Sequence, residues 1–276
     1  MTEETVRFWP PVPEAAIDLV GAYLHTGRGR AHVHEDWQFA VPDSPAKLLT
    51  GAFRRFAVGP TDVVVVRPYE VHTEGGGTGP APQWRVLHVA PSLVARAWRG
   101  ATGAVGPVLA DPTGAIELRN LLRSSEDRTI TGPEFLRRTL RWIEQLEHHH
   151  QAEGIRATRM PAVERARTYL QERATRAVSL SEVAAVAGVT VSHLVRSFSR
   201  AVGLPPKSYH AQLRLARARR LLAQGKSATW VAYECGFADQ SHLSRRFKES
   251  YGLTPGAFQT QYRGERVVAG VDSNAA

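Results

Sequence analysis

The sequence predicts a two-domain α+β protein, in which an N-terminal β-barrel with flanking helices precedes an all-α C-terminal domain. Within residues 5–100, short apolar runs alternate with Gly, Pro and Asp turn signals, which is the spacing of a small barrel or sandwich. Residues 192–209 and 241–258 then repeat one pattern, S-H-L-x-R-x-F-x4-G-L-x-P. This duplication indicates two copies of one helical unit. A chain of 276 residues is long enough for both domains.

The charge of the chain is divided unequally between its halves. Residues 1–154 hold 16 Lys/Arg and 18 Asp/Glu, a net of −2, whereas residues 155–276 hold 19 and 8, a net of +11, and together they give the chain's +9. The excess positive charge therefore lies in the half that carries the repeat. This asymmetry predicts a polyanionic partner for that half, and nucleic acid is the commonest one.

The composition excludes several classes of protein. The sequence contains no window of ~18 uninterrupted apolar residues, so we expect no membrane span. The segment 1–13 lacks the basic and apolar regions of a secretory signal. A single cysteine, Cys235, excludes an intramolecular disulfide and a Cys-based zinc cluster, and we interpret it as a small packing residue. We therefore expect a cytoplasmic location.

The N-terminal half is expected to contain strands at 20–24, 36–41, 62–66 and 86–89, followed by helices. Short helices are predicted at 92–98 and 116–123. A longer helix at 134–147 has an apolar stripe formed by Leu136, Leu140 and Ile143, widened by Phe135, Trp142 and Leu146. The stripe either packs on the β domain or, because Trp142 widens it beyond one face, forms a helix–helix dimer contact. We predict a homodimer through helix 134–147.

The C-terminal half predicts helices with clear start and stop signals. Pro161 suits a first helical turn, and Ser179 or Ser181 with Glu182 begins a short helix that ends at Gly188. A third helix at 191–202 is closed by Gly203, and an Arg-rich helix follows at 209–223. The second copy repeats the short helix, the glycine turn and a helix at 240–251. These elements form two helix-turn-helix units joined by a long helix.

One face of each longer helix predicts contacts with DNA bases. Ser192, Val195 and Arg196 occupy one face of the first copy, and Gln240, Ser241, Ser244 and Arg245 occupy that of the second. Arginine pairs with guanine and glutamine with adenine. Side chains off this face are expected to contact phosphate; they are His193, Arg200, His242, Arg246 and Lys248. A single basic helix is usually a solvated surface, but two matching copies favour DNA binding. Because Val195 and Ser244 differ at equivalent positions, one chain should bind an asymmetric site.

The second copy, A-Y-E-C-G-F-A-D-Q-S-H-L-S-R-R-F-K with Gly252 and Pro255, is similar to the signature of the AraC/XylS family of transcription regulators. Residues 160–262 resemble the DNA-binding domain of that family. The resemblance implies a sequence-specific regulator that binds double-stranded promoter or operator DNA. It places helices 191–202 and 240–251 in successive major-groove segments, about 34 Å apart. RNA polymerase is a further candidate partner.

The segment His32-Val33-His34 with Gln38, followed by Gly59 to Pro68 and His72, resembles the first cupin motif. Residues 5–110 resemble the sensor domain of AraC-type regulators, so the barrel is expected to be cupin-like. Strand alternation places His32 and His34 on one face. We predict an effector pocket formed by His32, His34, Gln38, His72, His88 and Trp84.

Two chemical interpretations of the pocket remain open. His32, His34 and His72 could hold iron, zinc or nickel, which would make the protein a cupin metalloenzyme fused to a DNA-binding module. However, Gln38, a weak neutral ligand, stands where the motif usually has glutamate. We therefore favour a small organic effector and predict no cofactor and no enzymatic activity.

The resemblance also sets the expected domain boundaries. Residues 1–150 are assigned to a cupin-like effector-binding and dimerisation domain, and residues 151–160 to a linker. Residues 161–264 are assigned to the DNA-binding domain and residues 265–276 to a disordered tail.

Overall fold

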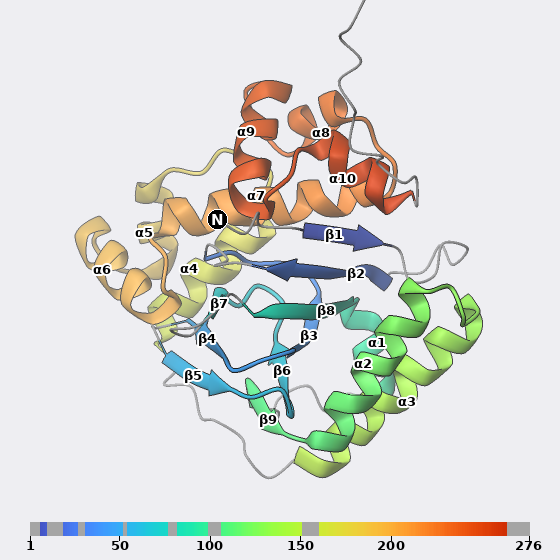
Figure 1. Ribbon diagram of the computed structural model, residues 1–276. Helices are drawn as coiled ribbons and strands as arrows, with labels where there is room; N and C mark the ends of the chain where they lie inside the picture. Colours follow the sequence, from blue (N-terminus) through green and yellow to red (C-terminus); the bar gives the residue numbers. More distant parts are fainter. Residues whose placement is uncertain are drawn as a thin grey trace, which may run out of the picture.

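The computed structural model describes residues 6–9, 19–26, 31–51, 54–76, 82–98, 106–150 and 160–263 of the chain. At 6–9, 19–26, 76 and 147–150 the description covers the backbone alone. An N-terminal domain of strands and helices is followed by a purely helical C-terminal domain (Figure 1). The predicted linker and tail fall almost wholly outside the described residues.

The strands form two antiparallel sheets. The larger sheet has the order β1-β2-β8-β3-β6-β9, with β1 Val6–Trp9, β2 Leu19–Thr26, β8 Gln83–Val89, β3 Trp37–Pro42, β6 Asp62–Val66 and β9 Val108–Ala110. The smaller sheet has the order β5-β4-β7, with β5 Arg54–Val58, β4 Ala46–Thr50 and β7 His72–Gly76. Among the described strands no ladder joins the two sheets into a closed barrel.

The two sheets bury an apolar layer between them. Ala40, Val64 and Val86 of the larger sheet share a cluster with Ala46, Leu48 and Val58 of the smaller one. The period-two alternation of strands sends the neighbouring residues to the outer face. There Trp37, Phe39, Val41, Leu87 and Val89 form a second cluster. The larger sheet is thus buried on both faces in its central strands.

Helices α1 Pro91–Ala97, α2 Pro112–Glu126 and α3 Gly132–His150 cover this outer face (Figure 1). The apolar stripe of α3 packs on the β domain, since Phe135, Trp142, Ile143 and Leu146 all lie in the outer cluster. Trp142 is only 3% exposed, and its Nε1 donates to Gly114 O at 2.9 Å. Our reason for a dimer contact through this helix was therefore wrong, because Trp142 is enclosed by its own chain.

The C-terminal domain consists of α4 Pro161–Glu172, α5 Leu180–Ala187, α6 Val191–Val202, α7 Pro206–Ala223, α8 Ala228–Glu234, α9 Gln240–Tyr251 and α10 Pro255–Tyr262. Ser179, rather than Ser181, caps α5: its Oγ accepts from Glu182 N at 3.2 Å, and Glu182 accepts from Ser179 N at 2.7 Å. Helix α7 begins three residues before the predicted start at 209, because Pro206 fits the first turn of a helix.

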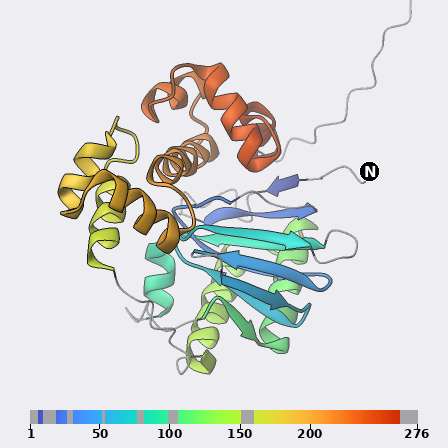
Figure 2. The same ribbon diagram turned by 90° about the vertical axis from the view of Figure 1, so that its left-hand side faces the viewer.

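The two domains share apolar contacts. Val33 and Val71, which flank the sheets, belong to the cluster formed by α4 to α7. Leu215, Ala218 and Leu222 of α7 join the cluster that lies between the sheets. Figures 1 and 2 show α7 running next to the strands of the N-terminal domain, with α8 and α9 on its far side. The repeated unit is therefore packed directly against the sensor half.

Among the helices of the described residues, none combines the length and apolar character needed to cross a bilayer.

Candidate functional site

Helices α6 and α9 are built in the same way. At their N-termini, Thr190 Oγ1 accepts from His193 N at 3.3 Å, and Asp239 Oδ1 accepts from His242 N at 2.7 Å. At their C-termini, Gly203 and Gly252 have φ of 89° and 78°, the left-handed conformation that favours glycine. The two copies therefore present their first turns from equivalent, capped positions.

The inner faces of these helices are fully buried, and the outer faces are open to solvent. Leu194, Phe198, Leu243 and Phe247 are each 0% exposed. None of the predicted DNA-binding residues is buried. Nine are exposed: Ser192, His193, Arg196, Arg200, Gln240, Ser241, Arg245, Arg246 and Lys248. Three are partly exposed: Val195, His242 and Ser244.

Two of these side chains have additional contacts within the protein. Gln240 Oε1 accepts from Thr229 Oγ1 at 2.7 Å, which fixes its amide at the start of α9. The His242 ring lies edge-on to Phe237, with centroids 5.5 Å apart. His242 thus supports the turn as well as lying at the surface.

The turns within the two units have the predicted chemistry. Gly188 and Gly236 have φ of 70° and 71°, and a Cβ on Gly236 would lie 2.7 Å from Thr175 O. Ala184 and Ala232 are 3% and 1% exposed, as expected for small residues where helices cross closely. Both units are helix-turn-helix motifs joined by α7.

The six residues predicted to form the sensor pocket are all buried. Gln38 of β3 lies opposite His88 of β8 in the ladder, and the backbones of His32 and His72 exchange two hydrogen bonds of 3.1 Å. The ring centroids are 4.2 Å apart for His32–His72, 4.8 Å for His34–His72 and 4.6 Å for His34–His88. The structure thus brings the four histidines into one contiguous group. Trp84 lies in the apolar layer between the sheets.

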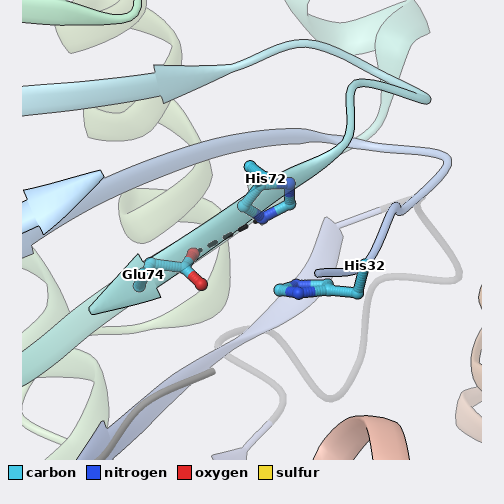
Figure 3. A group of neighbouring side chains, drawn as sticks. All are labelled: His32, His72 and Glu74. Atoms are coloured by element: carbon cyan, nitrogen blue, oxygen red, sulfur yellow. Dashed lines mark ion pairs between the residues drawn. The ribbon is translucent and has the colours of Figure 1, made fainter. Parts of the chain in front are cut away.

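Sequence reasoning missed Glu74, which stands two residues after His72 on the same face of β7. Glu74 is 1% exposed; its Oε1 accepts from Gln38 Nε2 at 2.5 Å and lies 3.4 Å from His72 Nε2. Figure 3 shows Glu74 and His72 projecting toward His32. One donor atom from each of these three residues lies within 4.8 Å of the other two. The i, i+2 spacing from His72, which places both side chains on one face of a strand, is the signal that could have identified Glu74.

Sequence reasoning also missed an ion pair between the domains. Arg219 of α7 donates from Nη2 to Asp36 Oδ2 at 3.0 Å and from Nη1 to His88 Nε2 at 3.1 Å. Both members of the pair are buried, with side chains 5% and 1% exposed. Nearby, Arg220 Nη1 lies 3.4 Å from Glu35 Oε2. In the sequence, Arg219 is one of several arginines on a basic helix, so nothing distinguished it.

Burial and neighbouring charges shift the titration of these histidines. The pKa of His88 is held well below its usual value by burial and then by the Arg219 guanidinium. The pKa of His34 is also held well below its usual value, by burial and then by His72. Burial lowers the pKa of His72, but the charge and hydrogen bonding of Glu74 together with the contacts of Glu70 raise it, and the net shift is upward. His34 and His88 are therefore neutral around pH 7.

Comparison with known families identifies both halves of the chain. Residues 15–153 match the model of the AraC-like ligand binding domain, and residues 183–261 match that of a helix-turn-helix domain. The first match alone covers half of the 276 residues, so the chain belongs to the AraC family of transcription regulators. It is an AraC-type DNA-binding regulator with an N-terminal ligand-binding domain.

Relatives and solved structures agree with this assignment. An uncharacterized HTH-type transcriptional regulator of Bacillus subtilis (strain 168), YbfI, is 24% identical over 220 residues, which cover 76% of this chain and 79% of that protein. The structure of ToxT from Vibrio cholerae O395 has a TM-score of 0.56 and 12% identity, and the match covers 96% of this chain and 100% of ToxT. Wild-type ToxT from strain SCE256 with bound unsaturated fatty acid has a TM-score of 0.54, 12% identity and coverage of 96% and 97%. At this identity the ToxT structures show the fold alone.

Proposed function

We propose that this AraC-type regulator binds an asymmetric DNA site through α6 and α9, and that a ligand in the histidine pocket controls how these helices are presented. The observation that carries the second part is the ion pair of Arg219 with Asp36. It joins the helix that connects the two DNA-binding units to the residues beside the pocket. A ligand that disturbs this ion pair changes the position of α7 and hence of both units.

On the DNA side, the exposed outer faces of α6 and α9 support contacts with bases. Arg196 and Arg245 are exposed at equivalent positions in the second turns of α6 and α9, and both helices are capped by a hydroxyl or carboxylate. The copies differ at Val195 and Ser244, so they should prefer different bases. The net +11 of residues 155–276 supports a strong contribution from phosphate contacts.

The experiment that tests DNA binding uses the full chain and DNA from upstream of its own gene. We expect specific binding whose affinity falls steeply as salt rises from 50 to 200 mM, by about 10³-fold or more if six or more phosphates are contacted. A minimal site for one chain should not be palindromic. The absence of salt-dependent binding to any such fragment would contradict the DNA-binding part of the proposal.

On the ligand side, the contiguous histidine group supports a ligand site at His32, His34, Gln38, His72 and His88. Trp84 belongs to the apolar layer, and we propose that it forms a wall of the same site. A thermal-shift screen of the full chain tests this, because a ligand stabilises the folded state by RT ln(1 + [L]/Kd). A ligand that stabilises the wild type and a His88→Gln variant equally would place its site elsewhere.

The coupling between the two parts rests on buried polar contacts across the domain interface. Besides the Arg219 contacts, the Tyr209 hydroxyl donates to Tyr69 O at 3.2 Å. The equivalent residue of the second copy is Phe258, which lacks the hydroxyl and lies in an apolar cluster. The repeat therefore departs from its pattern where one copy meets the sensor domain.

A homodimer, a contact with RNA polymerase and a cytoplasmic location stay predictions. The apolar stripe of α3 is buried in its own chain, so a dimer through α3 would have to use its outer face, where Arg137, Arg138 and Arg141 are exposed. Sedimentation of the full chain at low and high salt tests this. An interface between arginine-rich faces should be favoured by high salt, which screens their repulsion.

The alternative of a cupin metalloenzyme with a DNA-binding appendage is not favoured by the family assignment. Both matched models describe parts of regulators, and YbfI is a transcriptional regulator by name.

A further inference from the structure

We propose that His32, His72 and Glu74 bind one divalent transition-metal ion, and that this ion is the ligand to which the sensor domain responds. The second part rests on the proposed function; the first part is independent of it. All three residues are buried, and one donor atom from each lies within 4.8 Å of the other two (Figure 3). The group comes from β7 and from the segment that precedes β3.

The donor set has the chemistry of a transition-metal site. Imidazole nitrogen and carboxylate oxygen are ligands of zinc, iron, cobalt and nickel, and two histidines with one carboxylate form a known facial arrangement. Metal–ligand bonds of about 2.0–2.2 Å arranged tetrahedrally place the donor atoms roughly 3.3–3.6 Å apart. His72 Nε2 and Glu74 Oε1, which are 3.4 Å apart, already meet this spacing. The donor atom of His32 lies within 4.8 Å of both, so a small rearrangement of the group brings it to metal-binding distance.

The backbone contacts of His72 and of the neighbouring His34 indicate which ring nitrogen carries the hydrogen, and Nε2 of His72 faces Glu74. Nδ1 of His72 lies 3.0 Å from Glu70 O, and Nδ1 of His34 lies 2.6 Å from Asp36 O. A carbonyl oxygen only accepts, so Nδ1 of each ring carries the hydrogen and the neutral ring has its lone pair on Nε2. A backbone carbonyl that orients a ring in this way is the usual outer partner of a metal-bound histidine. In the described part of the chain, the buried Nε2 of His34 has no hydrogen-bond partner.

The carboxylate is positioned by a second residue. Gln38, at the position where the cupin motif usually has glutamate, donates from Nε2 to Glu74 Oε1 at 2.5 Å. The carboxylate missing from β3 is thus supplied by β7, and the amide of Gln38 holds it in place. The pocket therefore contains a carboxylate ligand although Gln38 replaces the glutamate on β3.

Close packing of the rings also favours an ion over a bulky organic ligand. The centroids of His32 and His72 are 4.2 Å apart, which is ring-to-ring contact. An ion occupies only the space between donor atoms that already converge. A divalent cation also compensates a carboxylate that is 1% exposed, whose burial is otherwise costly.

The site is linked to the DNA-binding domain through two further rings. His34 contacts His72 on one side and His88 on the other, with centroids 4.8 Å and 4.6 Å apart. His88 in turn accepts from Arg219. A dication on His72 therefore repels the guanidinium of Arg219 across a buried region, where charges are poorly screened. Metal binding and the Arg219 contact should oppose one another, and by linkage each weakens the other equally.

Titration of the chelator-treated, dialysed full chain with Co²⁺ tests the site. We expect a visible absorption band that saturates at one equivalent. The band should be lost in Glu74→Gln, which keeps the shape of the side chain, and in His72→Ala, with helix content by circular dichroism unchanged. A matched control, His148→Ala/His149→Ala/His150→Ala, removes the other histidine-rich segment and should keep the band. A folded wild type without a saturable band, or a band that survives in both pocket variants, would overturn the metal site.

DNA affinity of the same preparations separates this inference from the proposed function. We expect the metal-free chain to bind DNA and Co²⁺ to change its affinity by about 5–150-fold, the usual range of coupling between two sites. In Arg219→Met, which lacks the repelling charge, Co²⁺ should bind more tightly. Salt-dependent DNA binding without any Co²⁺ band leaves the regulator intact and removes the metal site. If Co²⁺ binds but leaves the DNA affinity unchanged, the ion is not the controlling ligand. If the chain binds Co²⁺ but no DNA, the proposed function is wrong and the metal site stands.

Discussion

At the scale of the residue, Arg219 of α7 forms buried polar contacts across the domain interface. Its guanidinium contacts Asp36 and His88 and lies over the Tyr251 ring, with Cζ 5.9 Å from the centroid. It therefore joins strand, helix and pocket at one buried point. The desolvation of such a pair offsets much of its attraction, so its role is to fix one arrangement of the domains.

Replacement of Arg219 by Met is expected to destabilise the protein by ~3–5 kcal/mol, because the buried Asp36 carboxylate loses the cation that faces it. The midpoint of urea unfolding measures this. Arg220→Met is the control: its contact with Glu35 is half-exposed, and we expect a loss below ~1 kcal/mol. The double variant Asp36→Leu/Arg219→Met should recover part of the loss, and strict additivity of the two single changes would contradict the role of the pair.

His88 should make stability depend on pH. Its Nε2 accepts from Arg219, so the ring must be neutral, and its pKa is lowered well below the usual value of about 6.5 by burial and Arg219. Between the lowered pKa and about 6.5 the unfolded chain binds more protons than the folded one, so stability rises with pH and is lost as pH falls through this window.

The measurement is the melting temperature between about pH 7.5 and 5.5, across the ordinary histidine pKa. His88→Gln, which can still accept from Arg219, should show a shallower loss on acidification than the wild type. The lowered pKa of His34 also makes stability fall on acidification, whereas the raised pKa of His72 has the opposite effect. Both histidines are retained in the His88→Gln variant, so the comparison isolates His88. Equal slopes for the two proteins would contradict this assignment.

At the scale of elements, α6 and α9 are equivalent scaffolds with different surfaces. Their caps and buried faces match, while their outer faces carry Val195 in one copy and Ser244 at the equivalent position of the other. The duplication thus supplies two helices with the same backbone geometry. Specificity is expected where the two helices differ.

Arg196→Ala and Arg245→Ala are each expected to weaken binding to the specific site by roughly 1–3 kcal/mol, because a bidentate contact with guanine is lost. Binding to unrelated DNA should change much less. Arg55→Ala, an exposed arginine on the smaller sheet, is a charge-matched control and should alter neither. Equal losses on specific and unrelated DNA in a titration at fixed salt would identify the two arginines as phosphate contacts.

Gly203, which ends α6, lies against the other domain. A Cβ there would overlap the carbonyl oxygen of Gly51, and the residue has φ of 89°. Gly225, which follows α7, also has a left-handed φ of 80°, but a Cβ there meets nothing within 4 Å. The two glycines therefore share one backbone conformation and differ in their surroundings.

Gly225→Ala should cost only the left-handed strain of ~1–2 kcal/mol. Gly203→Ala should cost distinctly more, because the Gly51 backbone must also move, and the domains should separate at this contact. Thermal unfolding and protease sensitivity of the two variants compare these costs. Similar losses in both variants would show that Gly51 does not restrain Gly203.

The sequence predicted most elements wherever the local signal was strong. Helices α5, α6 and α9 end at the predicted glycines, and α5 begins at one of its two predicted caps, because those signals are local. Strands β1, β4, β5, β7 and β9 were not predicted. Strand β4 includes Lys47, and β7 consists of His, Thr, Glu and Gly, with few apolar residues. Helix α10 was also missed: its eight residues have no apolar stripe of their own, and Phe258 is buried by the packing of the domain.

At the scale of the whole molecule, the domains are predicted by sequence but their contact is not. The charge division and the repeat separate the halves. Glu74, Asp36 and Arg219 became part of the site only through tertiary contacts, since a buried charge in a sequence looks the same as an exposed one. The six residues predicted to form the pocket are all buried.

The shared apolar clusters predict cooperative unfolding of the two domains. Leu215 and Ala218 of α7 share a cluster with strands of both sheets, and Val33 and Val71 share one with α4 to α7. Unfolding of either domain therefore exposes part of the hydrophobic core of the other domain to solvent. We expect one calorimetric transition for the metal-free full chain, with coincident loss of near-ultraviolet and far-ultraviolet circular dichroism. Two well-separated transitions would contradict this expectation.

The placement of Tyr209 and Arg219 on α7 also limits how this regulator can be recombined. A chimera that fuses residues 1–150 to the DNA-binding half of a relative receives a foreign α7, and the partners of Asp36 and of the Tyr69 carbonyl change with it. We expect such exchanges to yield responsive proteins only when Tyr209 and Arg219 are transplanted together with the sensor. The part of this chain that must be transferred to keep the response is then the first half together with one face of α7, which begins more than fifty residues beyond residue 150.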